Sequence, residues 1–125
     1  MKFRLFQIAV PRSEYDAVNE MGWSEAMAKF PRVEAQQAVR IGGAKAYVSE
    51  YSQYYVNVSD IEANDLENAF FVHNNPFGDD ALEEQITRYA EQYSMSVGDV
   101  LVDEDGKSFI VDGFGFKEID FQEAA

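Results

Sequence analysis

Two short apolar runs in the carboxyl-terminal part constrain the fold of this chain most. They span residues 100–102 and 109–111, with Asp105-Gly106 between them. An Asp-Gly pair readily takes the positive φ angles that a two-residue type I′ turn requires. Residues 94–116 therefore predict a β-hairpin that is followed by a glycine-aromatic turn.

The predicted turn also sets a register, because residues equidistant from it lie opposite each other. One face of the hairpin is then apolar and is expected in the core; it carries Val100, Val102, Phe109 and Val111. The other face carries Leu101 and Ile110 beside carboxylates, and it places Asp99 opposite Asp112. Two facing carboxylates repel unless a backbone N–H, a cation or a basic partner compensates them. Whether this pair binds a cation is left open.

The amino-terminal half predicts a strand followed by helices. The strand covers residues 2–10, and its apolar residues change phase, which suits burial on both faces or a bulge. Helical patterns follow at 13–21, 24–30 and 33–41, separated by glycine and proline. Residues 44–51 and 53–58 are rich in valine and tyrosine and predict two more strands.

The carboxyl-terminal half adds two helices and a final strand. Asn64 and Glu67 form a capping-box pattern that opens a helix. The clearest helical periodicity covers residues 79–93, with acidic residues in its first turns. A last strand is predicted at 117–122, and residues 123–125 are expected to fray.

These patterns predict a single α+β domain over residues 1–125. We expect an antiparallel or mixed sheet of five to six strands, two to three helices packed on one side of it, and a carboxyl-terminal β-hairpin. A length of 125 residues with 46% hydrophobic and 14% aromatic content is enough for a real core. The amino-terminal apolar run is short and broken by Arg4 and Gln7, which predicts neither a signal peptide nor a membrane span. A cytoplasmic location is expected.

The charge is strongly negative and unevenly distributed. The net charge is −13, and residues 1–59 hold 7 Lys and Arg against 6 Asp and Glu, while residues 60–125 hold 3 against 17. Such a balance disfavours direct binding of nucleic acid or an anionic membrane, because phosphate binding depends on basic side chains. It fits either a solubilising surface or an acidic face that docks on a basic protein.

No catalytic or metal constellation stands out. Residues 101–112 superficially resemble a calcium loop, but Leu101 replaces the first carboxylate and the flanks predict strands. His73 is the only histidine, in the last turn of a predicted helix, where a structural role is expected. Ser94 and Ser96 have no evident base and are expected to cap the junction before the hairpin. We expect no metal and no cofactor, and without cysteine there is no thiolate chemistry.

Four segments in order resemble the YodL-like family, small domains of bacterial mobile elements and phages. They are FRLFQI, LENAFFVHNN with Phe70 and Asn75, SMSVGDVLV, and SFIVDGFGFKEI with Asp112, Gly113 and Phe116. The third segment is the most specific. Many relatives place a histidine before its first serine, whereas this chain has Tyr93. The resemblance implies a mobile-element context rather than a chemistry, because the family has no established catalytic activity.

Three functions are weighed. The favoured one is a non-enzymatic phage or mobile-element accessory protein that binds a host protein with a basic surface. The partner would be a nucleic-acid-binding or defence protein, and the chain would act as a DNA mimic or anti-defence inhibitor. The partner-binding candidates are Asp99, Asp103, Glu104, Asp105, Asp112 and Asp120. The residues assigned to the structural motif are Phe70, Asn75, Ser94, Ser96, Val97, Gly113 and Phe116.

The first alternative is a structural or regulatory interaction domain whose acidity serves solubility. The second is an enzyme or small-ligand binder with a site near Ser94, Ser96, Asp99 and His73. The oligomeric state is left open.

Overall fold

The computed structural model describes residues 1–76 and 78–123. Its centre is a six-stranded sheet of order β3-β2-β1-β4-β5-β6, in which every neighbouring pair is antiparallel. The strands are β1 (Lys2–Ile8), β2 (Tyr55–Glu62), β3 (Ile86–Arg88), β4 (Val100–Val102), β5 (Ser108–Asp112) and β6 (Gly115–Ile119). The predicted α+β domain with a carboxyl-terminal hairpin is confirmed.

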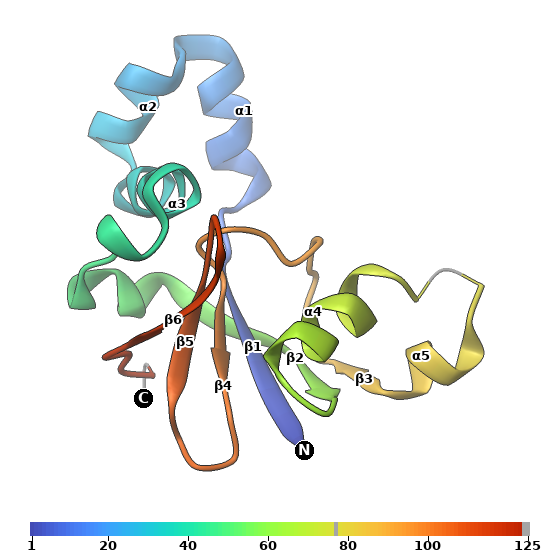
Figure 1. Cartoon of the computed structure of the whole chain (residues 1–125). Coiled ribbons are helices and arrows are strands. Elements are labelled where there is room, and N and C mark those ends of the chain that lie inside the picture. The colour runs from blue at the N-terminus through green and yellow to red at the C-terminus, as the bar shows by residue number, and fades with distance from the viewer. Residues whose placement is uncertain (77, 124–125) are drawn as a thin grey trace.

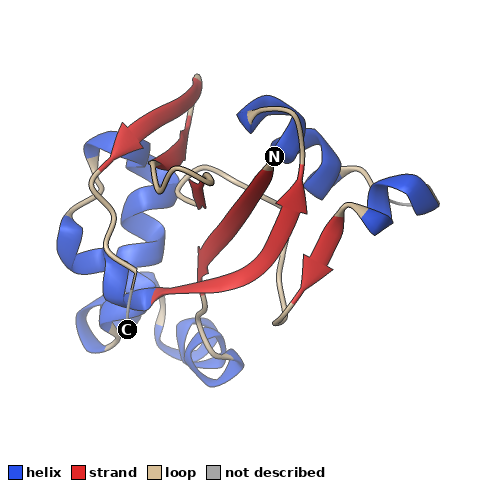
Figure 2. Ribbon diagram, turned by 90° about the horizontal axis from the view of Figure 1, so that it is seen from below, coloured by secondary structure: helices blue, strands red, loops and turns tan. Residues whose placement is uncertain are grey.

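Helices lie on both faces of this sheet, so the expectation that they pack on one side is wrong. They are α1 (Arg12–Met21), α2 (Trp23–Lys29), α3 (Pro31–Gly42), α4 (Leu66–Asn74) and α5 (Asp80–Glu84), with 3-10 turns η1 (Gly43–Lys45) and η2 (Ser49–Tyr54). Figure 1 shows α1–α3 grouped together and α4 and α5 well apart from them. Figure 2 shows helices to either side of the long strands β1 and β2.

Two apolar clusters, one on each face of the sheet, explain why helices pack on both faces. On one face, Ala35 and Val39 of α3 pack with Phe6 and Ile8 of β1. On the other face, helix α4 packs through Ala69 and Val72 with Phe3 and Leu5. Because successive residues of a strand point to opposite faces, the phase change in β1 reflects burial on both sides. Each face therefore needs its own helix.

The β4–β5 hairpin forms, but its register differs by one residue from the prediction. Val100 lies opposite Ile110, and Leu101 lies opposite Phe109. The turn has three residues, 104–106, because Asp103 Oδ1 accepts the N–H groups of Asp105 and Lys107, both at 2.9 Å. Gly106 alone takes a positive φ there. A one-residue shift moves side chains to the other face, so Val100 and Val102 share a face with Ile110, and Leu101 shares one with Val111.

The helix predicted at 79–93 is wrong beyond its first turns. Asp79 caps α5 by accepting from Ala81 N at 3.0 Å and from Leu82 N at 3.2 Å, but α5 ends at Glu84. The segment Ile86–Arg88 then pairs with β2 as strand β3. The open edge of β2 offers backbone partners that an isolated helical pattern does not anticipate, so the tertiary contact overrides the local periodicity.

The strand predicted at 44–51 is also wrong, because this stretch forms η1 and the start of η2. Its tyrosines pack on the α3 face instead: the Tyr47 and Tyr55 rings meet edge to face, with centroids 6.4 Å apart. The predicted strand at 53–58 becomes β2, which starts later and runs to Glu62.

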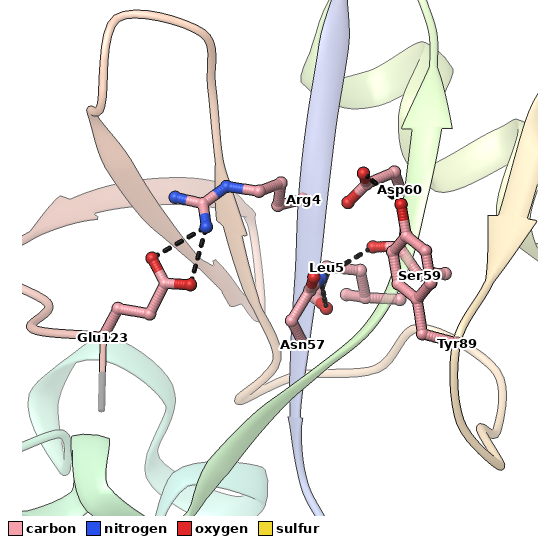
Figure 3. Close-up of polar contacts among 7 residues, drawn as sticks. All are labelled: Arg4, Leu5, Asn57, Ser59, Asp60, Tyr89 and Glu123. Atoms are coloured by element: carbon pink, nitrogen blue, oxygen red, sulfur yellow. Dashed lines mark hydrogen bonds and ion pairs between the residues drawn. The ribbon is translucent and has the colours of Figure 1, made fainter. Parts of the chain in front are cut away.

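Figure 3 shows two further features of the sheet, a bulge in β2 and an ion pair between β1 and a residue near the end of the chain. The β1–β2 register shifts between Leu5 and Phe6, so Val58 has no partner residue in β1. Beside it, Asn57 Nδ2 donates to Leu5 O at 3.1 Å. Arg4 holds Glu123 with Nη1 to Oε1 at 2.6 Å, so Glu123 is tied to β1 rather than frayed. The rest of that fraying prediction, residues 124–125, lies outside the described residues.

Candidate functional site

A cavity of about 360 Å³ lies between α4 and the β5–β6 turn. Its walls are mostly apolar, with the Phe70 and Phe116 rings edge to face at 6.5 Å and Val97 and Val111 beside them. Gly113 and Gly115 line it from the turn. Residues of the α4 segment, of the SMSV segment and of the GFGF segment are thus brought together, although they are far apart in the sequence.

The cavity continues into a second depression of about 670 Å³ that runs toward the β4–β5 turn. Phe3, Phe109 and Phe114 line this part, and Glu67, Gly115 and Phe116 line both parts. Phe114 is 99% exposed, because it stands in the two-residue turn between Asp112 and Gly115. We call the two parts together the acidic groove.

The groove is rimmed by carboxylates. Asp65 and Glu67 come from the start of α4, and Asp103 and Asp112 come from the two ends of the β4–β5 region. Among the residues that the structure describes, no lysine or arginine lines either part. An aromatic floor with an acidic rim attracts cations and basic segments.

Asp112 is held in position by η1, which directly follows α3. Its Oδ1 accepts from Ala44 N at 3.2 Å. Gly43 has a φ of +60°, and a Cβ there would stand 2.0 Å from the same oxygen. The close approach therefore needs a glycine at position 43 and fixes the Asp112 side chain beside the groove.

The predicted acidic residues do not form one surface. Asp103, Glu104 and Asp105 lie in the β4–β5 turn, and Asp120 lies at the same end, because the preceding Ile119 pairs with Ser108. Asp112 pairs with Gly115 at the other end.

Asp99 is 3% exposed and does not contribute to an acidic surface. It does not face Asp112 either, since Val111 N donates to Asp99 O at 2.8 Å. The predicted facing pair of Asp99 and Asp112 is therefore not formed in this register, and the question of a cation between them does not arise.

Asp99 is instead the centre of a buried hydrogen-bond cluster. Its Oδ2 accepts from Ser96 N at 2.9 Å and from Gln7 Nε2 at 3.0 Å. Burial raises the pKa of Asp99 to about 7, against the opposing effects of these bonds and of Arg40. Burial of the Tyr55 and Tyr93 side chains raises the pKa of each phenol, and the negative charge of Asp99 raises both pKa values further.

Side-chain hydrogen bonds hold in place the segment before the hairpin, which has no regular secondary structure. Asn74 Nδ2 donates to Met95 O at 3.0 Å, and Asn74 Oδ1 accepts from Met95 N at 2.7 Å. Ser96 Oγ donates to Ser94 O at 3.0 Å, which is a turn hydrogen bond; α5 ends at Glu84, so the helix end that the serines were expected to cap is not present at this junction. Asn75 Nδ2 donates to Phe71 O at 3.0 Å and closes the end of α4.

The alternative site near His73 is only partly assembled. His73 and Ser94 line a separate cavity of about 420 Å³, whereas Ser96 and Asp99 do not line it. His73 is buried, with Nε2 2.6 Å from Gln92 Oε1 and Nδ1 3.1 Å from Asn74 Oδ1. Both ring nitrogens already have amide partners, so the described contacts give the imidazole no serine to activate.

No group of three or more His, Cys, Asp or Glu side chains is placed to hold a metal ion among residues 1–76 and 78–123. In the same ranges, no helix has the length and apolar character needed to cross a membrane.

Comparison of the chain with protein-family models, with curated proteins and with solved structures finds no match.

The sequence predicts no groove. It marks Phe70, Val97, Gly113 and Phe116 as structural-motif residues and Asp112 as a partner-binding candidate, and the structure places all five in the lining of the cavity. Glu67 was considered only as a cap, and Asp65, Phe3 and Phe109 were not considered as site residues. The available signal was Phe114, since a phenylalanine between two glycines in a tight turn has little to pack against.

Proposed function

We propose that this chain is a non-enzymatic binding domain that docks on a basic surface of another protein through the acidic groove. One observation carries the proposal: the groove joins exposed and half-buried phenylalanines to four carboxylates, with no basic side chain among its described lining residues. Interfaces favour aromatic anchors at the centre and charges around them. Complementary charge at the rim speeds association and makes it sensitive to salt.

The resemblance to the YodL-like family supports a second part of the proposal, that the domain is an accessory protein of a phage or mobile element and that its partner is a host protein. The arrangement of the carboxylates favours the groove over imitation of a DNA backbone. Asp99 is buried, and Asp112 is separated from the acidic β4–β5 turn by the length of β5. The proposed docking therefore does not depend on a regular row of charges.

Affinity capture from a lysate of the natural host tests the proposal with a matched pair of variants. Phe114→Ser removes an aromatic side chain of the groove that is 99% exposed, and Trp23→Ser removes one on α2 that is 46% exposed and outside the groove. We expect wild type and Trp23→Ser to retain the same protein, Phe114→Ser to lose it, and high salt to release it. Equal retention by all three forms, or retention that salt does not weaken, would overturn the proposal.

A further inference from the structure

We infer that the cavity between α4 and the β5–β6 turn, which is one of the two parts of the acidic groove, binds a single arginine side chain of the partner. This inference rests on the proposed function, because it names the chemistry that the groove recognises. The cavity volume of about 360 Å³ is at the small end of the range for ligand pockets. It therefore suits one long side chain rather than a whole secondary-structure element.

The walls match the two parts of an arginine side chain. Val97 and Val111 offer apolar contact to an aliphatic stem, and Phe70 and Phe116 present rings to a planar cation. Glu67 and Asp112 supply the counter-charge at the same cavity. Guanidinium groups stack on aromatic rings and pair with carboxylates through two parallel hydrogen bonds, which an ammonium group does not do.

The two carboxylates make an apolar side chain of the partner an unfavourable occupant of this cavity. A leucine or phenylalanine side chain in this cavity would remove water from Glu67 and Asp112 without compensating their charges, which is costly. Neither carboxylate takes part in an ion pair among the residues that the structure describes. Asp112 accepts from Ala44 N through Oδ1, and a carboxylate has further acceptor positions on both oxygens, so Asp112 can still accept from a ligand.

Titration with small probes, followed by backbone amide NMR, tests the inference without knowledge of the partner. The probes are Nα-acetyl-arginine amide, its lysine counterpart, and Nα-acetyl-citrulline amide, which has the shape of arginine without its charge. We expect the arginine probe to shift the amide signals of Val97, Gly113 and Phe116. The lysine probe should bind more weakly, and the citrulline probe at least tenfold more weakly.

Charge-neutral variants locate the site. The double variant E67Q/D112N should bind the arginine probe at least tenfold more weakly, and the amide oxygen introduced by D112N can still accept from Ala44 N. The control E20Q/E25Q removes the same number of charges from α1 and α2, including an acidic residue in the first turn of a helix, and should bind as wild type does. Thermal unfolding of each variant checks that it remains folded.

Three outcomes would overturn the inference: no shift up to the solubility limit of the arginine probe, equal binding of citrulline, or unchanged binding by folded E67Q/D112N. None of them decides the proposed function, which depends on Phe114 and on capture of the partner. If capture requires Phe114 but is unaffected by E67Q/D112N, the groove docks a partner without an arginine in the cavity. If the arginine probe binds but Phe114→Ser still captures the partner, the cavity is an arginine site outside the interface.

Discussion

The side-chain amide of Gln7 pairs with the backbone of Tyr93 as a neighbouring strand would. Nε2 donates to Tyr93 O at 2.9 Å, and Oε1 accepts from Tyr93 N at 3.3 Å. Asn74 makes the same pair of bonds with Met95 two residues further on. Two side-chain amides thus hold the segment between β3 and β4 in place of a regular strand, and this segment brings Val97 to the groove.

Gln7→Leu should lower the free energy of unfolding by about 2 to 3 kcal/mol, because it leaves Tyr93 N and O and the buried Asp99 without this partner. Gln7 is 1% exposed, whereas Gln53 is exposed and donates only to Glu50 O. Urea denaturation of Gln7→Leu and of the control Gln53→Leu measures the difference. A loss no larger than that of the control would show that the amide pairing contributes little.

Asp99→Asn should remove a pH dependence of stability. The folded protein raises the pKa of Asp99 from 3.8 to about 7. The unfolded chain therefore loses this proton first, and wild type loses stability as the pH rises between these two values. Relative to Asp99→Asn, wild type should lose a few kcal/mol between pH 4 and pH 7 and little more above pH 8. Urea midpoints across this pH range test the sign, and parallel curves for the two proteins would contradict it.

Gly98→Ala should destabilise the protein far more than Gly106→Ala. Both glycines have positive φ, +98° and +82°. A Cβ at Gly98 would stand 2.7 Å from Val39 Cγ2 and 2.9 Å from Val39 C, while nothing lies within 4 Å of one at Gly106. We expect a loss of roughly 1 to 2 kcal/mol at Gly106 from backbone strain alone, and about 3 kcal/mol or more at Gly98, where α3 must also move. Thermal unfolding compares the two, and equal losses would exclude the steric contribution.

Phe114→Ser and Phe116→Ser should separate the exposed and half-buried aromatic residues of the groove. Phe114 is 99% exposed, so its loss should change the free energy of unfolding by no more than about 0.5 kcal/mol. Phe116 packs against Phe70 and the cluster beneath α4, so its loss should cost roughly 2 to 3 kcal/mol. Denaturant titration of both variants measures these values. A destabilised Phe114→Ser would mean that this ring supports the fold rather than being available to a partner.

Local signals in the sequence predicted the elements whose partners lie nearby. The glycine and proline positions between residues 13 and 41 separate three helices close to the predicted bounds. The phase change in β1 predicts either burial on both faces or a bulge; the strand is buried on both faces, and its register with β2 also shifts between Leu5 and Phe6. These features depend on backbone conformations and periodicities that a short window contains.

Contacts that the periodicity of the sequence does not reveal, one of them local and the others long-range, determine the remaining features. The open edge of β2 converts Ile86–Arg88 from the predicted helix into a strand. The hairpin register depends on Asp103, whose side chain captures two N–H groups and lengthens the turn by one residue. That shift buries Asp99 beside Gln7, a contact between residues 92 positions apart.

The amino-acid sequence is sufficient for the α+β class, the acidic carboxyl-terminal half and the list of motif residues. The folded structure is needed to see that one cavity is lined by Phe70, Val97, Asp112, Gly113, Phe116 and Glu67. This is so because a cavity is a property of packed surfaces. This cavity lies where three separate parts of the chain meet in the folded protein: helix α4, the segment held by Asn74, and the β5–β6 turn.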